Sequence, residues 1–402
     1  MTDSETTAAK SLPQSVPSAR SVKRFILSAF PMGHFANDWP GTTIYILAPA
    51  IALTMDLTPA QVGLLITLHS AGSSLAFLPA GLIADSVRKR GMLLAMTFWW
   101  VAIGYLCASL APNFWWLAGL ICFAGLGDSA WHPIATGVMV EQMPNRRAKV
   151  LGIHAVGGTL AAVGAPMFAG FLLAVLDWRT VLQVSVIPTV LMGIVFLKRA
   201  HWIPHRQGHG LNRSDLKLLA LLWLTPRGMR TIAIVVLYDM AMIAILSMLP
   251  LFVQNTHGFT TSQTGMLFGA FWLLSAALQP VLGNLSDVVG RKRVAASGMA
   301  IAAVLIAMIA AVPTPLSLTV VVILGAGTLG GIRAVLLASM VDVTGQREST
   351  TLGFAFAVMD GVGALGAVLA GVLGSIDLTY AFLFSAAVTF AAMGLSLVHR
   401  FE

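Results

Sequence analysis

Twelve long apolar segments follow one another along this chain, and they constrain its fold more than any other feature of the sequence. A helix needs about 20 mainly apolar residues to cross the hydrocarbon core of a bilayer. Only 10% of the residues are charged and 57% are hydrophobic, whereas an average soluble chain has about 25% charged residues. We therefore expect an all-α integral membrane protein with 12 transmembrane helices. The candidate spans lie at 24–53, 59–84, 91–111, 114–141, 149–176, 178–197, 230–254, 261–286, 293–312, 315–341, 350–375 and 378–398.

The positively charged residues predict the orientation of these spans. Nearly all of the 24 Lys and Arg residues lie in the tails or in every second loop, whereas Arg179 lies in a loop of the opposite side. Cytoplasmic loops carry an excess of Lys and Arg. We therefore expect a multi-pass protein of the inner (cytoplasmic) membrane of the cell, with both termini cytoplasmic. The net charge of +8 then reflects topology, and nucleic-acid binding is not expected.

The two halves of the chain resemble each other. Asp38 corresponds to Asp239 and Pro49 to Pro250, in both cases 201 positions further on. Two pseudo-symmetric six-helix bundles are typical of secondary transporters, whose substrates bind near the bilayer midplane between the halves. The predicted units are a disordered cytoplasmic tail (1–22), a first bundle (23–197), a cytoplasmic linker (198–229) with a possible interfacial helix from Ser214, and a second bundle (230–402).

Several motifs carry a resemblance to a known family. The second half contains Gly-x-x-x-Asp-x-x-Gly-Arg-Lys-Arg from Gly283 to Arg293, and the first half repeats it with Arg88 in place of the second glycine. With this motif the chain resembles the major facilitator superfamily along essentially its whole length. "HFAND", "GLGDSAWHP" and "HAVGG" are similar to the fosmidomycin-resistance-type branch. The resemblance implies the major facilitator fold and a monomer.

The resemblance also implies a latch at the cytoplasmic ends of the two halves. An Asp in a loop between basic residues can pair with an Arg and with a helix amino terminus. Topology signalling alone is the alternative role of these charges. The candidate latch residues are Asp85, Lys89, Arg90, Glu141, Asp287, Arg291, Arg293 and Asp342.

Five charged residues fall inside predicted spans, where each costs several kcal/mol unless it faces water or a partner. They are Asp38, Asp128, Asp239, Arg333 and Asp360. The first four lie on spans 1, 4, 7 and 10, which line the central cavity in the superfamily. This distribution predicts a polar cavity between the halves.

Two of these residues have a histidine four positions away. His34 precedes Asp38 and His132 follows Asp128, so each pair lies on one face of its helix. A carboxylate next to an imidazole can take up or release a proton near neutral pH. The spacing predicts proton coupling at these four residues, and a hydrogen-bonded pair that only fixes helix packing is the alternative.

Arg333 is the one cation among the five. Its planar guanidinium suits a carboxylate, phosphate or phosphonate, and it could instead neutralise Asp239 or Asp360 in an empty cavity. We assign all three residues to the substrate cavity. Aromatic side chains that could complete its walls are Tyr45, Tyr238, Trp39, Trp131 and Trp272.

These features predict a proton-coupled secondary active transporter that works by alternating access. The segment "GGTLAAVGAPMFAG" resembles the Gly-Pro motif of exporters and favours an efflux antiporter for a small organic, amphipathic or anionic compound. Uptake of an organic anion by symport and export of a divalent metal through the His and Asp residues of spans 1 and 4 are alternatives. No HExxH, GxSxG or Walker pattern occurs, so we expect no enzyme, no catalytic or resident metal site and no cofactor besides H⁺. The expected partners are the substrate, protons and the lipid bilayer.

Overall fold

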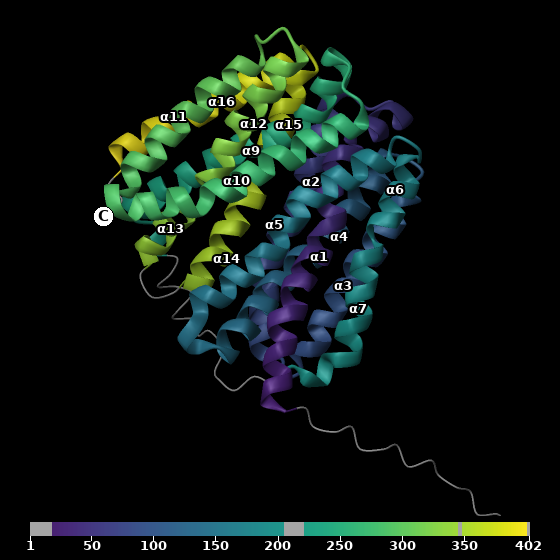
Figure 1. Cartoon of the computed structure of the whole chain (residues 1–402), viewed down its shortest axis with the longest axis vertical. Helices are drawn as coiled ribbons and strands as arrows, with labels where there is room; N and C mark the ends of the chain where they lie inside the picture. The colour runs from purple at the N-terminus through teal and green to yellow at the C-terminus, as the bar shows by residue number, and fades with distance from the viewer. Residues whose placement is uncertain (1–17, 205–220, 345–347, 400–402) are drawn as a thin grey trace, which may run out of the picture.

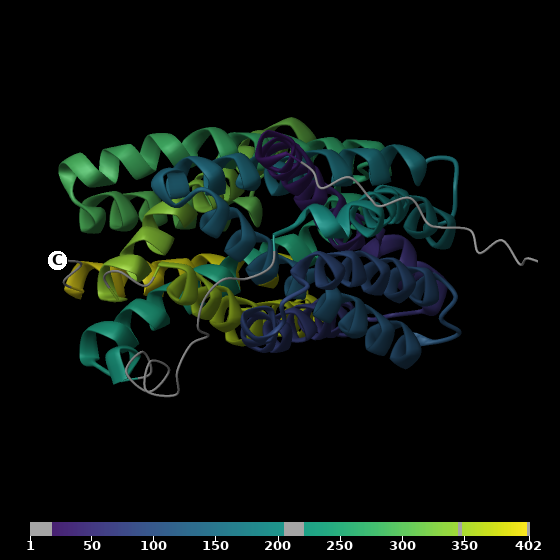
Figure 2. The same cartoon turned by 90° about the horizontal axis from the view of Figure 1, so that it is seen from below.

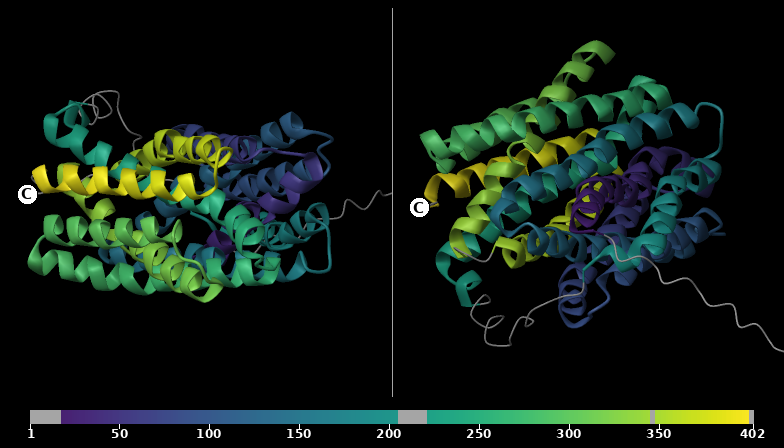
Figure 3. Two further views of the ribbon diagram at one scale, coloured as in Figure 1. Left: turned by 90° about the horizontal axis from the view of Figure 1, so that it is seen from above. Right: turned by 60° about the horizontal axis from the view of Figure 1, so that its bottom comes forward.

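The computed structural model describes residues 18–204, 221–344 and 348–399, which form helices and short connections. The first-half helices, purple to teal, lie beside the green and yellow helices of the second half (Figure 1). The end marked C belongs to the second half, and the purple and blue helices fill the opposite end of the molecule (Figures 2 and 3). The fold is that of two six-helix bundles.

Six spans form the first bundle, and the sixth is broken at Val186. A 3₁₀ turn at Pro144–Arg146 joins the fourth span to the fifth, and another at Ala200–Trp202 follows the sixth. The helices are α1 (Ala19–Met55), α2 (Pro59–Ser86), α3 (Arg90–Ser109), α4 (Phe114–Gln142), α5 (Arg147–Leu172), α6 (Trp178–Ser185) and α7 (Ile187–Arg199).

The second bundle contains two interrupted spans. The tenth is broken between α12 and α13, and the eleventh contains a π-helical turn at Met359–Gly363. The helices are α9 (Pro226–His257), α10 (Thr261–Val289), α11 (Arg291–Ile309), α12 (Pro315–Gly331), α13 (Arg333–Thr344), α14 (Glu348–Val358), α15 (Leu365–Gly374) and α16 (Thr379–Val398). Each of the twelve predicted spans therefore corresponds to a helix or to an interrupted helix, which confirms the predicted fold class.

The boundaries of the predicted tail and linker differ from the observed helix ends. Helix α1 begins at Ala19, inside the predicted disordered tail, because the Ser18 side chain accepts a hydrogen bond from Ser21 N at the helix start. Helix α9 begins at Pro226 rather than at residue 230, after the N-cap Thr225. Most of the predicted interfacial helix, which starts at Ser214, lies outside the described residues, as do residues 1–17.

Ten spans in the described part of the chain are long and apolar enough to cross a membrane. They correspond to every predicted span except the first and the fourth. Helices α1 and α4 are long enough, with 37 and 29 residues, but neither contains a sufficiently apolar stretch of 18 residues. These two helices carry the polar turn around Asp38 and the polar turn around Asp128, which interrupt their apolar stretches.

The second span of each bundle begins in the same way. Thr58 and Gln61 form a capping box at the start of α2, and Thr260 and Gln263 form one at the start of α10. In a capping box the two side chains satisfy backbone N–H groups that have no partner within the helix. The internal repeat of the sequence is therefore repeated in the local structure.

The short loops on the side predicted to be external also cap helices. Asp177 accepts hydrogen bonds from the N–H groups of Arg179 and Thr180 at the start of α6. Hydrogen bonds from Thr180 hold the pKa of the Asp177 carboxyl below its usual range. Hydrogen bonds from Thr379 likewise lower the pKa of the Asp377 carboxyl.

The bundles pack closely on this predicted external side. Helix α2 contacts α15, and α5 contacts α10. A Cβ atom at Gly63 would lie 2.2 Å from the carbonyl oxygen of Ala367, and one at Gly265 would lie 2.4 Å from that of Pro166. Only glycine permits such an approach of two backbones. The two bundles are therefore closed against each other here.

Candidate functional site

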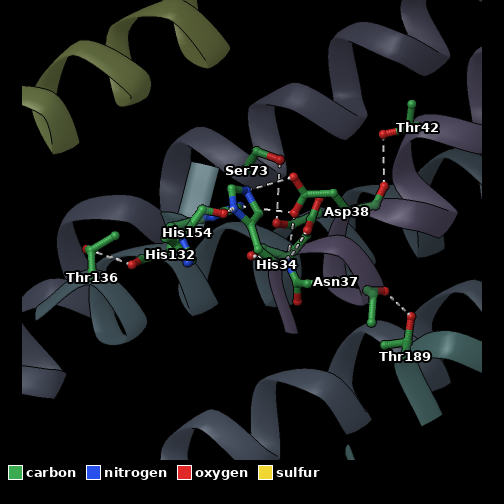
Figure 4. A network of polar contacts seen from close by, with 12 residues as sticks. His34, Asn37, Asp38, Thr42, Ser73, His132, Thr136, His154 and Thr189 are labelled. Atoms are coloured by element: carbon green, nitrogen blue, oxygen red, sulfur yellow. Dashed lines mark hydrogen bonds and ion pairs between the residues drawn. The ribbon is translucent and has the colours of Figure 1, made fainter. Parts of the chain in front are cut away.

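Asp38 is the centre of a polar cluster in the first bundle (Figure 4). Its Oδ2 lies 3.1 Å from His34 Nε2 on the preceding turn of α1, which confirms that these two side chains share a face. Its Oδ1 lies 3.5 Å from His132 Nε2 on α4. The side chains of Asp38 and His132 keep 25% and 23% of their accessible surface, so both can be reached by water-sized molecules.

Asp128 is joined to α1 through Asn37 rather than through its own histidine. The Asn37 amide Nδ2 donates to the Asp128 side chain and, at 3.0 Å, to the Asp128 carbonyl oxygen. Asp128 and His132 offer ligand atoms within 4.8 Å of each other, as their spacing on one helix face predicts, but the ion-pair contact of His132 is with Asp38 across the helix interface. The two pairs predicted separately therefore merge into one cluster between α1 and α4.

His154 on α5, the first residue of the "HAVGG" segment, completes the cluster, although its spacing from the other polar residues does not predict this. Its ring stacks on His34 with 4.2 Å between centroids and 19° between planes. The residue is 4% exposed, and neither ring nitrogen has a hydrogen-bond partner among the described residues. Gly158, one turn further on, leaves room for the neighbouring ring, because a Cβ atom there would lie 2.6 Å from His34 Nε2. The "HAVGG" segment thus shapes the space around His34.

The hydrogen bonds of His34 determine where a proton must lie. His34 Nδ1 is 2.9 Å from the backbone carbonyl oxygen of His154, and a carbonyl oxygen can only accept. Nδ1 therefore carries a hydrogen, and in the neutral imidazole Nε2 carries none. Nε2 faces a carboxylate oxygen of Asp38, so two acceptors would meet unless one proton lies between them. The pair requires one proton, held either as imidazolium and carboxylate or as imidazole and carboxylic acid.

Two triads in this cluster have the spacing of metal ligands. One consists of His34, His132 and His154, and the other of Asp38, Asp128 and His132. Within each triad the ligand atoms lie within 4.8 Å of one another. Mixed imidazole and carboxylate ligands suit first-row divalent metals. The convergence that export of a divalent metal would need is therefore present.

The second bundle places its three charged residues near an irregular backbone. Arg333 follows the break between α12 and α13, and Asp360 lies in the π-helical turn. Such turns occur frequently at functional sites. Asp239 on α9 is 7% exposed, and its Oδ2 has no hydrogen-bond partner among the described residues. Arg333 forms no ion pair with Asp239 or Asp360 in the described part of the chain, and its guanidinium lies 5.6 Å from the ring centre of Phe356.

The predicted aromatic walls divide into accessible and buried residues. Tyr45 and Trp272 are half-buried. Trp39 is 8% exposed and packs against Ala161 and Ala165. Trp131 and Tyr238 are 0% and 2% exposed, so in this structure they pack within the bundles rather than line an accessible wall. A separate pocket of about 440 Å³ at the ends of α9, α10 and α12 contains none of the charged residues above.

The candidate latch residues form ion pairs inside each bundle. Arg90 on α3 binds Glu141 on α4 at 2.6 Å, and Arg291 on α11 binds Asp342 on α13. These pairs are related by the internal repeat. Arg291 also contacts Asp287 at 3.2 Å. A latch between the two halves stays a prediction: the described pairs join helices of the same half, the side chain of Asp85 lies outside the description, and Lys89 and Arg293 are exposed.

The repeated pairs differ in burial, and this predicts unequal stability effects. Glu141→Gln leaves the charge of Arg90, whose side chain is 3% exposed, without its carboxylate, which costs about 3 kcal/mol at a buried site. Asp342→Asn acts on Arg291, whose side chain is 22% exposed, and costs about 1 kcal/mol or less. Thermal unfolding of the purified variants in detergent measures both. Equal shifts of the unfolding midpoint would contradict the role given to burial.

The chain matches the profile of the Major Facilitator Superfamily over residues 32–269 and 231–401. A probable nitrate/nitrite transporter, NarK2 of Mycobacterium tuberculosis, is 26% identical over 77% of this chain and 80% of its own length. The fosmidomycin resistance protein of Escherichia coli is 23% identical over 88% of each chain. A probable 4-methylmuconolactone transporter of Cupriavidus pinatubonensis is 27% identical, but the match covers 38% of this chain and only 36% of that relative.

The fold agrees with these sequence matches. A bacterial homolog of the human lysosomal transporter Spinster, solved in an inward-facing and unoccupied conformation, superimposes with a TM-score of 0.82. The superposition covers 95% of this chain and 97% of that chain at 16% identity. The helices, the internal repeat and these matches lead to one conclusion: this chain is a transporter that belongs to the Major Facilitator Superfamily, and it is not an enzyme.

Proposed function

We propose that the protein is a proton-coupled secondary transporter that works by alternating access. The observation that carries this proposal is the His34–Asp38 pair, whose geometry requires one proton. Both side chains are partly accessible, at 14% and 25%, so a proton can reach the pair from water. A ligand shifts an equilibrium between two states only through different affinities for them. A proton bound more tightly in one orientation would therefore drive the exchange between inward- and outward-facing states.

We further propose that transport runs outward, as antiport of a small organic, amphipathic or anionic compound. The relative named for fosmidomycin resistance and the Gly-Pro-like segment of α5 support export. The relative named as a nitrate/nitrite transporter and the guanidinium of Arg333 support an anionic compound, which uptake by symport would also suit. The distribution of Lys and Arg supports an inner-membrane protein with both termini cytoplasmic.

Proteoliposomes that contain a pH-sensitive dye test coupling and direction together. Compounds that raise the unfolding temperature of the purified protein are added to one side, and the internal pH is followed. Antiport moves protons and compound in opposite directions, whereas symport moves both in the same direction. If no compound that binds also moves protons, the coupling proposal is wrong.

Export of a divalent metal is a second candidate, because three imidazoles and two carboxylates converge around Asp38. The chemistry of these groups suits Zn²⁺, Co²⁺ or Ni²⁺. Calorimetric titration of the purified protein with these ions distinguishes this candidate from transport of an organic compound. Absence of binding would exclude a metal substrate and leave the proton-coupled proposal intact.

A further inference from the structure

A row of flat side chains crosses the boundary between the two bundles. The ring of His132 on α4 stacks near Phe77 on α2, with 6.2 Å between centroids and 25° between planes. Phe77 in turn lies 5.8 Å from Phe356 on α14, at 30°. The row ends at Arg333, whose guanidinium lies over the ring of Phe356. The row therefore connects the polar cluster around Asp38 in the first bundle to Arg333, which lies within the tenth predicted span in the second bundle.

Arg333 is a permanent cation that forms no ion pair within 4.0 Å among the described residues, although its charge acts on Asp239 and Asp360 from a greater distance. A carboxylic acid can avoid the cost of burial by taking up a proton, but a guanidinium stays charged. Asp239 and Asp360 can thus be neutralised without a ligand, whereas Arg333 cannot. The residue is half-buried rather than sealed, so a ligand can approach it. An unpaired charge at membrane depth therefore favours an anion as its partner.

The neighbour of the arginine narrows the class of anion. The guanidinium fork matches the two oxygens of a carboxylate. Phe356 is half-buried beside it, and an aromatic ring prefers a second flat ring in an offset or edge contact. Phe77 is 7% exposed and supports Phe356 from the other bundle. An aliphatic acid could pair with the guanidinium of Arg333 but would form no ring contact with Phe356.

We propose that the substrate is a flat aromatic or conjugated carboxylate, bound with its carboxylate on Arg333 and its ring against Phe356. This inference rests on the proposed transport function, and it names the substrate class of that function. Because Phe77 of the first bundle contacts Phe356, occupation of the site by such a ligand would depend on how closely the two bundles approach at these two rings.

Binding of simple probes to the purified full-length protein tests the inference without any gradient. Benzoate, cyclohexanecarboxylate, benzamide and benzylamine differ in ring type and charge, and calorimetry measures their affinities. Benzoate is expected to bind about threefold to tenfold more tightly than cyclohexanecarboxylate, because aromatic contact is lost in the latter. Benzamide and benzylamine are expected not to bind. Equal binding of benzoate and benzamide, or preferential binding of benzylamine, would overturn the proposal.

Substitutions test separately the carboxylate contact at Arg333 and the ring contact at Phe356. Arg333→Gln is expected to abolish benzoate binding and Arg333→Lys to weaken it, whereas Arg230→Gln, at an exposed position of α9, leaves it unchanged. Phe356→Leu is expected to bring the affinity ratio of benzoate to cyclohexanecarboxylate close to one. Phe171→Leu, at a 51% exposed position, keeps the ratio. Unchanged benzoate affinity in Arg333→Gln, or an unchanged ratio in Phe356→Leu, would refute the assignment.

The same experiments separate this inference from the proposed function. If benzoate binds through Arg333 but drives no proton movement in proteoliposomes, the result supports the substrate site and contradicts proton coupling. If protons move with compounds of another class while benzoate does not bind, coupling stands and the substrate class is wrong.

Discussion

Asp38→Asn is expected to abolish proton-driven transport while the protein stays folded. An asparagine at this position can donate its amide hydrogen to His34 Nε2, which faces residue 38 at 3.1 Å in the native protein. The pair then needs no proton, because a donor and an acceptor already meet. Transport of a bound compound under an imposed pH gradient, measured in proteoliposomes, should fall to the level of liposomes without protein. Exchange of compound without a gradient is expected to persist.

Asp56→Asn provides the matched control. Asp56 ends α1 in the left-handed conformation, with φ of 52°, which asparagine also tolerates. This variant makes the same chemical change on the same helix but outside the polar cluster, so its flux should equal that of the native protein. Undiminished pH-driven flux in Asp38→Asn would remove Asp38 from the coupling mechanism.

The second large effect is expected from a single methyl group at the contact between the bundles. In Gly265→Ala the new Cβ atom would meet the carbonyl oxygen of Pro166 at 2.4 Å, and a backbone atom cannot rotate away. Overpacking costs about 3 kcal/mol at the upper end of its usual range. This cost applies only to the state in which α5 and α10 are in contact. It would therefore shift the equilibrium between the inward- and outward-facing states by about 100-fold toward the outward-facing state.

Labelling of a reporter cysteine measures this shift. Thr42→Cys, in a chain whose Cys107 and Cys122 are replaced by serine, places a thiol on α1 one turn from Asp38. Reaction with a membrane-impermeant maleimide from the predicted external side should become much faster when Gly265→Ala is added. Gly283→Ala lies on the same helix with no atom within 4 Å of its Cβ position, so it should not change the rate. Equal rates in both variants would show that the glycine contact does not control access.

The helices could be predicted from the sequence because each is determined by local features. About 20 apolar residues in succession indicate a membrane span, and the Thr58 and Thr260 capping boxes can be recognised at helix starts. The contact of His34 with Asp38 was equally predictable, because residues four apart on one helix are neighbours. Interruptions such as the π-helical turn at Met359–Gly363 have no comparable sequence signal.

Contacts between helices were much less predictable. His132 contacts Asp38 as well as lying near Asp128. The rotation of α4 against α1 decides this additional partner, and spacing within α4 carries no information on that rotation. His154 joins the cluster from α5 for the same reason. Trp131 is an apolar residue next to His132 in sequence, but it points into the bundle core and stacks on His154, with 5.2 Å between centroids. Which face of a span meets a cavity depends on packing across the whole bundle.

The atom that orients His34 is a peptide oxygen, contributed by His154 of a different helix. Mutational scans that exchange side chains one at a time are blind to such an acceptor, since every substitution at position 154 retains it. If a genetic screen finds that position 154 accepts many substitutions, this result would therefore not show that α5 has no role in proton binding. A slide or tilt of α5 against α1 would break this hydrogen bond and release the imidazole. Proton binding by His34 and Asp38 is therefore expected to depend on α1 and α5 moving together.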